Sequence, residues 1–74
     1  MTFKEFVNEV EIAILDRPSF IREGQAVFNY IDSRYGGVAR AVQYQDNVDC
    51  FHRDSEIMNF LECAYKRITK NGNQ

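Results

Sequence analysis

The sequence has no long apolar run, few cysteines and no export segment that we can identify, and each lack excludes a class of protein. The longest unbroken aliphatic run is residues 12–15, whereas a membrane-spanning helix needs about 20 apolar residues. Two cysteines are too few for the dense disulfide framework of a small secreted domain. No basic segment followed by an apolar run stands at the N-terminus, so we expect a chain of the reducing cytoplasm.

Glycine is scarce and the net charge is small, which removes most nucleotide-binding classes. The four glycines form neither a phosphate-binding loop nor a dinucleotide fingerprint, and no nucleophile elbow occurs. Nine Lys and Arg against eleven Asp and Glu leave a net charge of -2, which argues against a role dominated by the phosphate backbone of nucleic acids. Tryptophan is absent, yet 45% hydrophobic and 14% aromatic residues are typical of a folded globular protein.

The length allows one small domain. We expect a single helical domain at residues 1–70 and a frayed tail at residues 71–74. Ordering a chain costs roughly 1.5 kcal/mol per residue, so nearly every large apolar side chain must be buried for such a domain to fold. Few apolar side chains are then left to line a deep pocket.

A capping box and an apolar stripe predict the first helix at about residues 2–16. Thr2 and Glu5 have the T-x-x-E spacing in which each side chain accepts from the backbone N–H of the other. The stripe at helical spacing consists of Phe3, Phe6, Val7, Val10 and Ile14. Pro18 ends this helix, because the residue before a proline avoids the helical region.

The second helix is expected to begin between residues 21 and 24 and to end at a glycine pair. Gly36 and Gly37 are typical of a helix end, because glycine takes the left-handed conformation without strain. Gly24 lies on the apolar side of the helix, where glycine costs roughly 1 kcal/mol relative to alanine. We therefore expect another part of the chain to approach Gly24 closely, and a short third helix after the glycine pair.

An aromatic loop at residues 43–53 precedes the last helix, which we expect from Asp54 to about Lys70. Asp54 is expected to cap that helix, since its carboxylate can accept from the unpaired N–H groups of the first turn. The predicted fold class is all-α: a compact bundle of four helices, the third short, with an ordered aromatic loop before the last. The expected core is Phe3, Val7, Val10, Ile14, Phe28, Ile31, Tyr35, Val42, Phe51, Ile57, Phe60, Leu61, Ala64 and Ile68.

The densest group of reactive side chains is Asp49, Cys50 and His52. A cysteine nucleophile needs a base within hydrogen-bond reach, and the only histidine lies two positions from Cys50. The pattern identifies no group to orient His52, no oxyanion hole and no substrate cleft. We interpret Cys50 as a small, partly buried apolar residue and His52 as a solvated side chain, and we expect no catalytic residue and no enzyme.

The metal-ligating side chains complete no known pattern. Cys50, His52 and Cys63 supply three zinc ligands, whereas a structural zinc site takes four. The acidic residues of the loop lack the alternating positions and the mid-loop glycine of a calcium site. We therefore expect neither a metal nor another cofactor, and no disulfide in a reducing compartment.

The second and third helices around a glycine turn also have the outline of a helix-turn-helix. In that interpretation the third helix would read DNA with Arg40 and Gln43, aided by Arg34 and Arg53. The net charge of -2 argues against DNA binding, because such binding depends on neutralisation of the phosphates by basic side chains. A small DNA-binding regulator therefore remains an alternative rather than the main hypothesis.

Residues 22–29 and 49–54 carry one likeness to a known family. The first segment, R-E-G-Q-A-V-F-N, is similar to the pattern R-x-G-Q-A-x-x-N, and the second, D-C-F-H-R-D, to a D-P-F-Y-x-D motif. With the following Ile57 and the F-L pair at residues 60–61, they resemble a family of short, uncharacterised bacteriophage and prophage proteins. The likeness covers about residues 22–61.

The resemblance implies a phage or mobile-element setting, where small acidic proteins often bind a host or phage protein. Two positions depart from the family pattern: Cys50 replaces its proline and His52 its tyrosine. A ring at the second position implies packing rather than catalysis. The family brings no activity that can be assigned to particular residues.

Two amides one helical turn apart predict how the aromatic loop is held. Gln25 and Asn29 can donate to and accept from a loop backbone, so we expect them to fasten the loop onto the second helix together with Asp49 and Asp54.

These patterns favour a non-enzymatic protein-binding module, with an inhibitor or modulator of a host protein as the specific form. The expected partner is a host or phage protein in the host cytoplasm. A self-associating structural subunit is a further alternative, since a small core gains from oligomerisation. The expected contact residues are Ile12, Leu15, Met58 and Tyr65, because they carry apolar groups off the main stripes.

Overall fold

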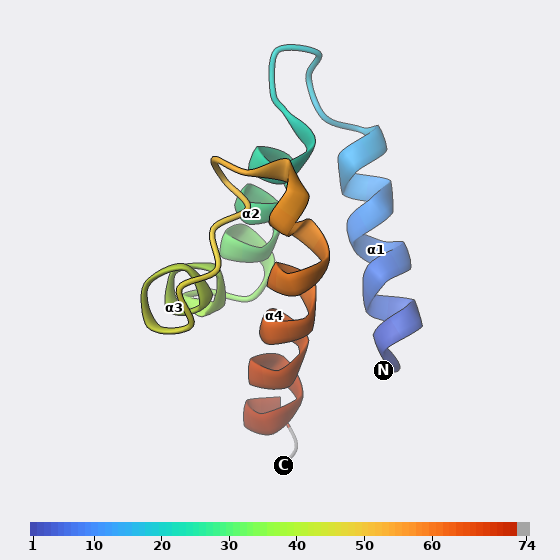
Figure 1. The fold of residues 1–74 in the computed structure, drawn as a ribbon. Coiled ribbons are helices and arrows are strands. Elements are labelled where there is room, and N and C mark those ends of the chain that lie inside the picture. Colours follow the sequence, from blue (N-terminus) through green and yellow to red (C-terminus); the bar gives the residue numbers. More distant parts are fainter. Residues whose placement is uncertain (73–74) are drawn as a thin grey trace.

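Four α-helices and one short 3-10 helix make up the part of the chain that is described (Figure 1). This computed structural model describes the backbone of residues 1–72 and the side chains of residues 1–70. In chain order the elements are α1 (Phe3–Leu15), α2 (Glu23–Arg34), α3 (Val38–Gln45), η1 (Asp54–Glu56) and α4 (Ile57–Gly72). No strand occurs within residues 1–72, and the predicted all-α class is confirmed.

Helix α1 begins and ends through local hydrogen bonds. The Thr2 hydroxyl accepts from the Glu5 N–H at 3.1 Å, and a Glu5 carboxylate oxygen accepts from the Thr2 N–H at 2.8 Å, so the predicted capping box is present. Beyond the helix, the Arg17 guanidinium donates to the carbonyls of Ile14 at 2.7 Å and Ile21 at 2.8 Å. These two bonds close the turn that leads into α2.

Helices α2 and α3 are separated by the predicted glycine turn. Gly36 has a φ of 67°, in the left-handed region, so glycine ends α2 there without strain. Helix α3 has 8 residues, in agreement with the expected short third helix, but it includes residues 43–45, which were predicted to belong to the aromatic loop.

The last helix differs from the prediction at both ends. Residues 54–56 form the 3-10 helix η1 instead of the first turn of an α-helix, and no side chain caps η1. Helix α4 starts at Ile57 and continues to Gly72, two residues beyond the predicted end. Residues 73 and 74 of the predicted frayed tail lie outside the described residues.

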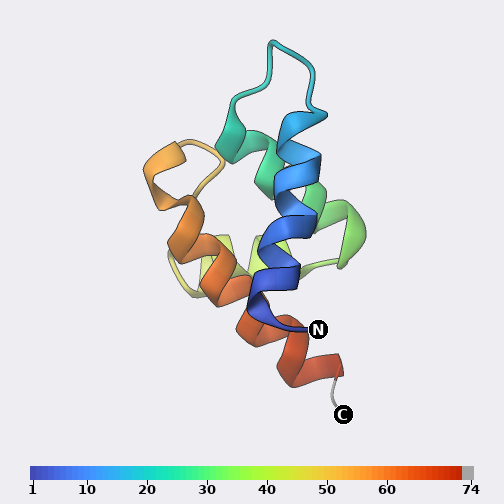
Figure 2. The same cartoon turned by 90° about the vertical axis from the view of Figure 1, so that its right-hand side faces the viewer.

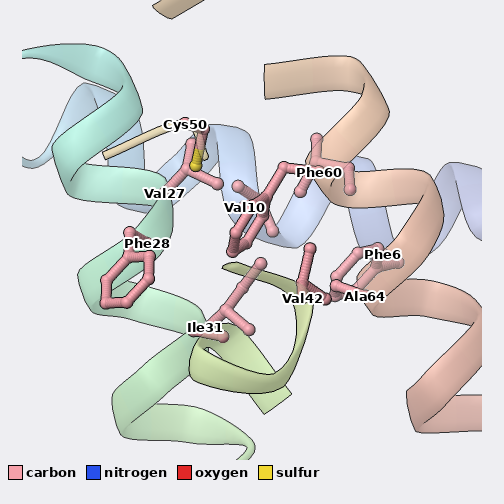
Figure 3. Close-up of a cluster of buried hydrophobic side chains, with 11 residues drawn as sticks. Phe6, Val10, Val27, Phe28, Ile31, Val42, Cys50, Phe60 and Ala64 are labelled. Atoms are coloured by element: carbon pink, nitrogen blue, oxygen red, sulfur yellow. The ribbon is translucent and has the colours of Figure 1, made fainter. Parts of the chain in front are cut away.

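The helices pack around one hydrophobic core. Helix α1 lies against α2 and α4, while α3 lies against both α2 and α4 (Figures 1 and 2). Side chains of all four helices and of the aromatic loop meet at the centre (Figure 3). The buried cluster is Phe6, Val10, Val27, Phe28, Ile31, Ala39, Val42, Cys50, Phe60, Leu61 and Ala64.

All fourteen predicted core residues are buried or pack against this cluster. The predicted list omitted Phe6 and Val27, although both stand on the apolar stripes. It also omitted Cys50, which was expected to be partly buried and is completely buried. The aromatic loop packs beside α2. The rings of Phe51 and Phe28 meet in a T-shaped arrangement with centroids 5.4 Å apart.

Candidate functional site

The aromatic loop is fitted directly against the first turn of α2 at Gly24. A Cβ on Gly24 would lie 2.0 Å from the Cys50 carbonyl oxygen and 2.7 Å from an Asp54 carboxylate oxygen. The Cys50 thiol in turn donates to the Gly24 carbonyl at 3.3 Å. No side chain fits between the two segments, and the predicted close approach at Gly24 is confirmed.

Asp54 caps α2 rather than the helix that follows it. Its Oδ1 accepts from the Gly24 N–H at 3.0 Å, and Gly24 is in the first turn of α2, where N–H groups have no partner within the helix. The Arg22 Nε lies 3.7 Å from the same oxygen, and the Arg22 guanidinium donates to the Phe51 carbonyl. The prediction that Asp54 caps its own helix is therefore wrong, because its carboxylate bonds across the fold to an N–H of the first turn of α2.

Asp49 organises the loop itself. Its carboxylate accepts from the backbone N–H of Phe51 at 3.0 Å, from Gln43 Nε2 at 3.2 Å, and pairs with His52 Nδ1 at 2.8 Å. Burial opposes the charge, but the hydrogen bonds from His52 and Gln43 hold the pKa of Asp49 below its ordinary value. Asp49 thus supplies the group that orients His52, which the sequence pattern did not identify.

Cys50 and His52 do not form a nucleophile–base pair. The Cys50 side chain is completely buried among core residues (Figure 3). The His52 side chain is mostly exposed. Burial, reinforced by the charge of Asp49, raises the pKa of Cys50 to about 12, so the thiol stays protonated at neutral pH. Cys50 and Cys63 are both free thiols, and among the described residues no three His, Cys, Asp or Glu side chains are grouped to hold a metal ion.

Two of the four residues expected to fasten the loop make the contacts that hold it. Asp54 bonds to α2 and Asp49 bonds to Gln43 of α3. Within residues 1–70, no hydrogen bond joins Gln25 or Asn29 to the loop, and Asn29 is exposed. For these two amides the expectation is corrected: the backbone of Gly24 makes the contact with the loop instead.

Three of the four side chains proposed to read DNA have partners within the chain, and the fourth, Arg53, lines a surface hollow. Arg40 Nε lies 3.6 Å from Asp32, and Gln43 donates to Asp49. The Arg34 guanidinium stacks over the Tyr35 ring at 4.9 Å from the centroid.

A surface hollow of about 500 Å³ lies beside α3 and contains side chains of both charges. It is lined by Gln43, Tyr44, Asn47, Asp49, His52, Arg53 and Glu56.

Large apolar side chains are exposed at one end of the molecule. Ile12 is 67% exposed, Leu15 84% and Phe20 84%. The first two belong to the second half of α1, and Phe20 stands in the loop between α1 and α2, which projects from that end (Figure 1). Ile12 and Leu15 were expected contact residues, whereas Phe20 was missed because a loop has no period against which an exposed side chain can be recognised.

The two other expected contact residues have different surroundings. Met58, near the start of α4, is exposed. Tyr65 packs against Phe3 and Phe6 with ring centroids 5.3 and 5.8 Å apart, and its hydroxyl donates to the Met1 carbonyl at 2.7 Å. Tyr65 therefore joins the start of α1 to α4.

A groove between α1 and α2 adjoins the exposed Ile12. It has a volume of about 500 Å³ and is lined by Glu9, Ile12, Ala13, Asp16 and Tyr30. One oxygen of Glu9 accepts from the hydroxyls of Tyr30 at 2.6 Å and Tyr35 at 2.7 Å. Burial, followed by the hydrogen bond to Glu9, raises the pKa of both tyrosines, that of Tyr35 to about 12.

Comparison of the chain with models of protein families, with curated proteins and with solved structures finds no significant match. Within the described residues, no helix has both the length and the apolar character to cross a membrane. The two surfaces above, the loop junction at Gly24 and the exposed end of α1, are therefore judged on their own chemistry.

Proposed function

We propose that this chain is a non-enzymatic protein-binding module, and that it binds its partner through Ile12, Leu15 and Phe20. The observation that carries the proposal is the exposure of these three large apolar side chains at one end of the molecule. We call them the α1 end.

The energetic argument rests on burial. Covering a large aliphatic or aromatic side chain contributes about 1.5–3 kcal/mol, and interface energy is concentrated in a few such residues. Single exposed apolar residues are common, but three large ones within nine positions of the chain give this end the kind of apolar surface that partners cover. Covering the α1 end would therefore contribute to the affinity for a partner.

The resemblance of residues 22–29 and 49–54 to phage proteins supports a partner of phage or bacterial host origin. In that setting the module acts as an inhibitor or modulator of a host protein in the host cytoplasm. The DNA-binding alternative has less support, because Arg40 and Gln43 have partners within the chain.

Affinity capture from an infected or lysogenic bacterial host tests the proposal. The tagged parent is compared with a triple variant, Ile12→Ser, Leu15→Ser and Phe20→Ser, and with a control carrying Tyr44→Ser and Met58→Ser. The control removes two exposed apolar side chains elsewhere on the surface. We expect a host or phage protein to be recovered with the parent and the control, and to be lost at least about tenfold with the triple variant, which corresponds to 1.4 kcal/mol.

Equal recovery with the triple variant would contradict the proposed surface. Recovery of nucleic acid alone would favour the DNA-binding alternative. Light scattering on the same samples reports self-association, and a dimer that the triple variant dissolves would identify the partner as a second copy.

A further inference from the structure

We propose that the groove between α1 and α2 receives a cationic side chain, arginine or lysine, from an apolar segment of the partner protein. This inference rests on the proposed function and adds the chemistry of the segment that the α1 end binds. The groove is contiguous with that end, because Ile12 belongs to both.

The polar part of the groove consists mainly of two carboxylates. Glu9 and Asp16 line it, and neither takes part in an ion pair among the described residues. Both hydrogen bonds to Glu9 reach the same oxygen, Oε2, which leaves Oε1 open to a further donor. A guanidinium or ammonium group in the groove can donate to one of these carboxylates, while the charge of the other adds to the attraction.

The basic side chains beside the groove have partners of their own. The Arg34 guanidinium lies over the Tyr35 ring at 4.9 Å from its centroid. Arg17 follows Asp16 directly, but its guanidinium donates to the carbonyls of Ile14 and Ile21. The charge of α1 and its C-cap is strongly one-sided, with Glu5, Glu9, Glu11 and Asp16 against Lys4. The field over this helix therefore attracts a cation from outside the chain.

Asp16 stands where it weakens the fold. It is the C-cap of α1, whose last turn has no basic residue, and the carbonyl end of a helix repels negative charge. A carboxylate at this position does not stabilise α1. A contact with a partner's cation gives it a role that the folded chain alone does not.

The apolar walls suit the rest of such a side chain. Ile12, Ala13 and the ring of Tyr30 line the groove beside the carboxylates. The methylene groups of arginine or lysine pack along apolar surface while the charged end reaches polar groups. Arginine is also enriched among the residues that dominate interface energies. The occupant is thus a segment with apolar residues for the α1 end and one cation for the groove.

A pair of synthetic peptides tests the charge directly. The probe is an amphipathic helix of about 18 residues, with leucines along one face and arginines beside them. The matched control replaces each arginine by citrulline, which keeps the shape and removes the charge. Nuclear magnetic resonance titration of the isotope-labelled chain at low ionic strength should place the largest amide shifts at Ile12, Ala13 and Tyr30. We expect the citrulline peptide to bind about tenfold more weakly.

Two variants of α1 locate the effect. Asp16→Asn should weaken binding of the arginine peptide about fivefold or more, because it removes a carboxylate that lines the groove. Glu11→Gln removes the same charge from an exposed position of the same helix outside the groove, so it should change affinity less than about twofold.

Each contrary result has a distinct meaning. Equal binding of the two peptides at the same residues would overturn the cation site and leave the α1 end as an apolar contact. Equal losses for Asp16→Asn and Glu11→Gln would reduce the effect to general attraction and overturn it as well. Groove shifts that grow with protein concentration without peptide would assign the groove to a second copy. The proposed function fails separately, through the triple variant in the capture experiment.

Discussion

The Gly24 junction and the α1 end differ in how completely their groups are satisfied. At the junction, Asp54 accepts from the Gly24 N–H, Cys50 donates to the Gly24 carbonyl, and a single added carbon would clash. At the α1 end, Leu15 and Phe20 are mostly exposed and nothing in the described chain covers them. The first region is therefore built to hold the fold, and the second has surface that folding leaves unused.

This contrast also shows that residues with reactive side chains need not form a reactive site. Cys50, His52 and Asp49 are the residues that sequence reasoning first considers for chemistry, yet they hold the loop in place. The α1 end contains ordinary apolar side chains. The following predictions test whether the two regions differ as described, from the largest expected effect to the smallest.

Gly24→Ala should give the largest loss of stability. The new Cβ would overlap the Cys50 carbonyl at 2.0 Å, which is backbone and cannot turn aside. Overpacking of this kind costs about 1–3 kcal/mol and occasionally more, and the Asp54 cap is displaced at the same time, so we expect a loss of at least about 3 kcal/mol. Urea unfolding followed by circular dichroism measures it.

Gly37→Ala is the matched control for this substitution. A Cβ at Gly37 meets nothing within 4 Å, and its φ of -73° suits any residue. The free energy of unfolding should therefore change by less than about 1 kcal/mol. A Gly24→Ala variant as stable as the Gly37→Ala variant would mean that the loop does not sit against α2 in solution.

Asp54→Ala should cost about 1–2 kcal/mol, the usual loss for removing a helix-capping acceptor. Asp54→Asn keeps an acceptor for the Gly24 N–H and should recover part of that loss. Asn29→Ala, at an exposed position of α2, should change stability by less than about 0.5 kcal/mol. Thermal unfolding of the three variants compares them, and a larger loss for Asn29→Ala than for Asp54→Ala would restore the predicted amide contact.

The sequence predicted the contacts between residues that are close along the chain and missed those between residues that are far apart along it. The capping box of Thr2 and Glu5 and the turn at Gly36 depend on residues within a few positions, so the ends of α1 and α2 could be predicted. The bond from Gly24 to Asp54 spans 30 positions. A carboxylate before an apolar helix is ordinarily assigned as the cap of that helix. Nothing in the sequence pattern shows that the first turn of α2 lies within hydrogen-bond reach of Asp54.

The same dependence on contacts between distant segments explains which of the predicted contact residues are exposed. Helical spacing places Ile12 and Leu15 off the stripe of α1, and both are exposed. Tyr65 also stands off its stripe, but the start of α1 crosses that side of α4, so Phe3 covers it. Which helices cross, and where, is a property of the whole fold.

Alkaline pH should destabilise the fold through the buried Cys50 thiol at the Gly24 junction. The pKa of Cys50 is raised from 9.0 to about 12 in the folded chain, chiefly by burial. The folded state therefore binds the thiol proton more tightly, and the stability that this supplies is complete below pH 9 and lost as the pH rises to about 12. At pH 10 the linked loss is roughly 1 kcal/mol.

Urea midpoints measured between pH 8 and 10.5 show this loss as a falling curve. In a Cys50→Ala variant the thiol is gone, so the curve should be flatter even though the variant starts from a lower stability. Cys63 provides the comparison within one molecule: it is only partly buried, so a thiol reagent at pH 8 should modify it well before Cys50. Equal modification rates would show that the loop opens freely.

Leu15→Ser should have the smallest effect, a change in the free energy of unfolding of less than about 0.5 kcal/mol, because the side chain is already in water. The neighbouring Ile14 packs against the core, so Ile14→Ser should cost about 1–2 kcal/mol by loss of apolar burial. The two substitutions make the same chemical change at adjacent positions of α1 and differ mainly in burial. If they proved equally costly, Leu15 would be covered in solution, and a loss that grows with protein concentration would show that a second copy covers it.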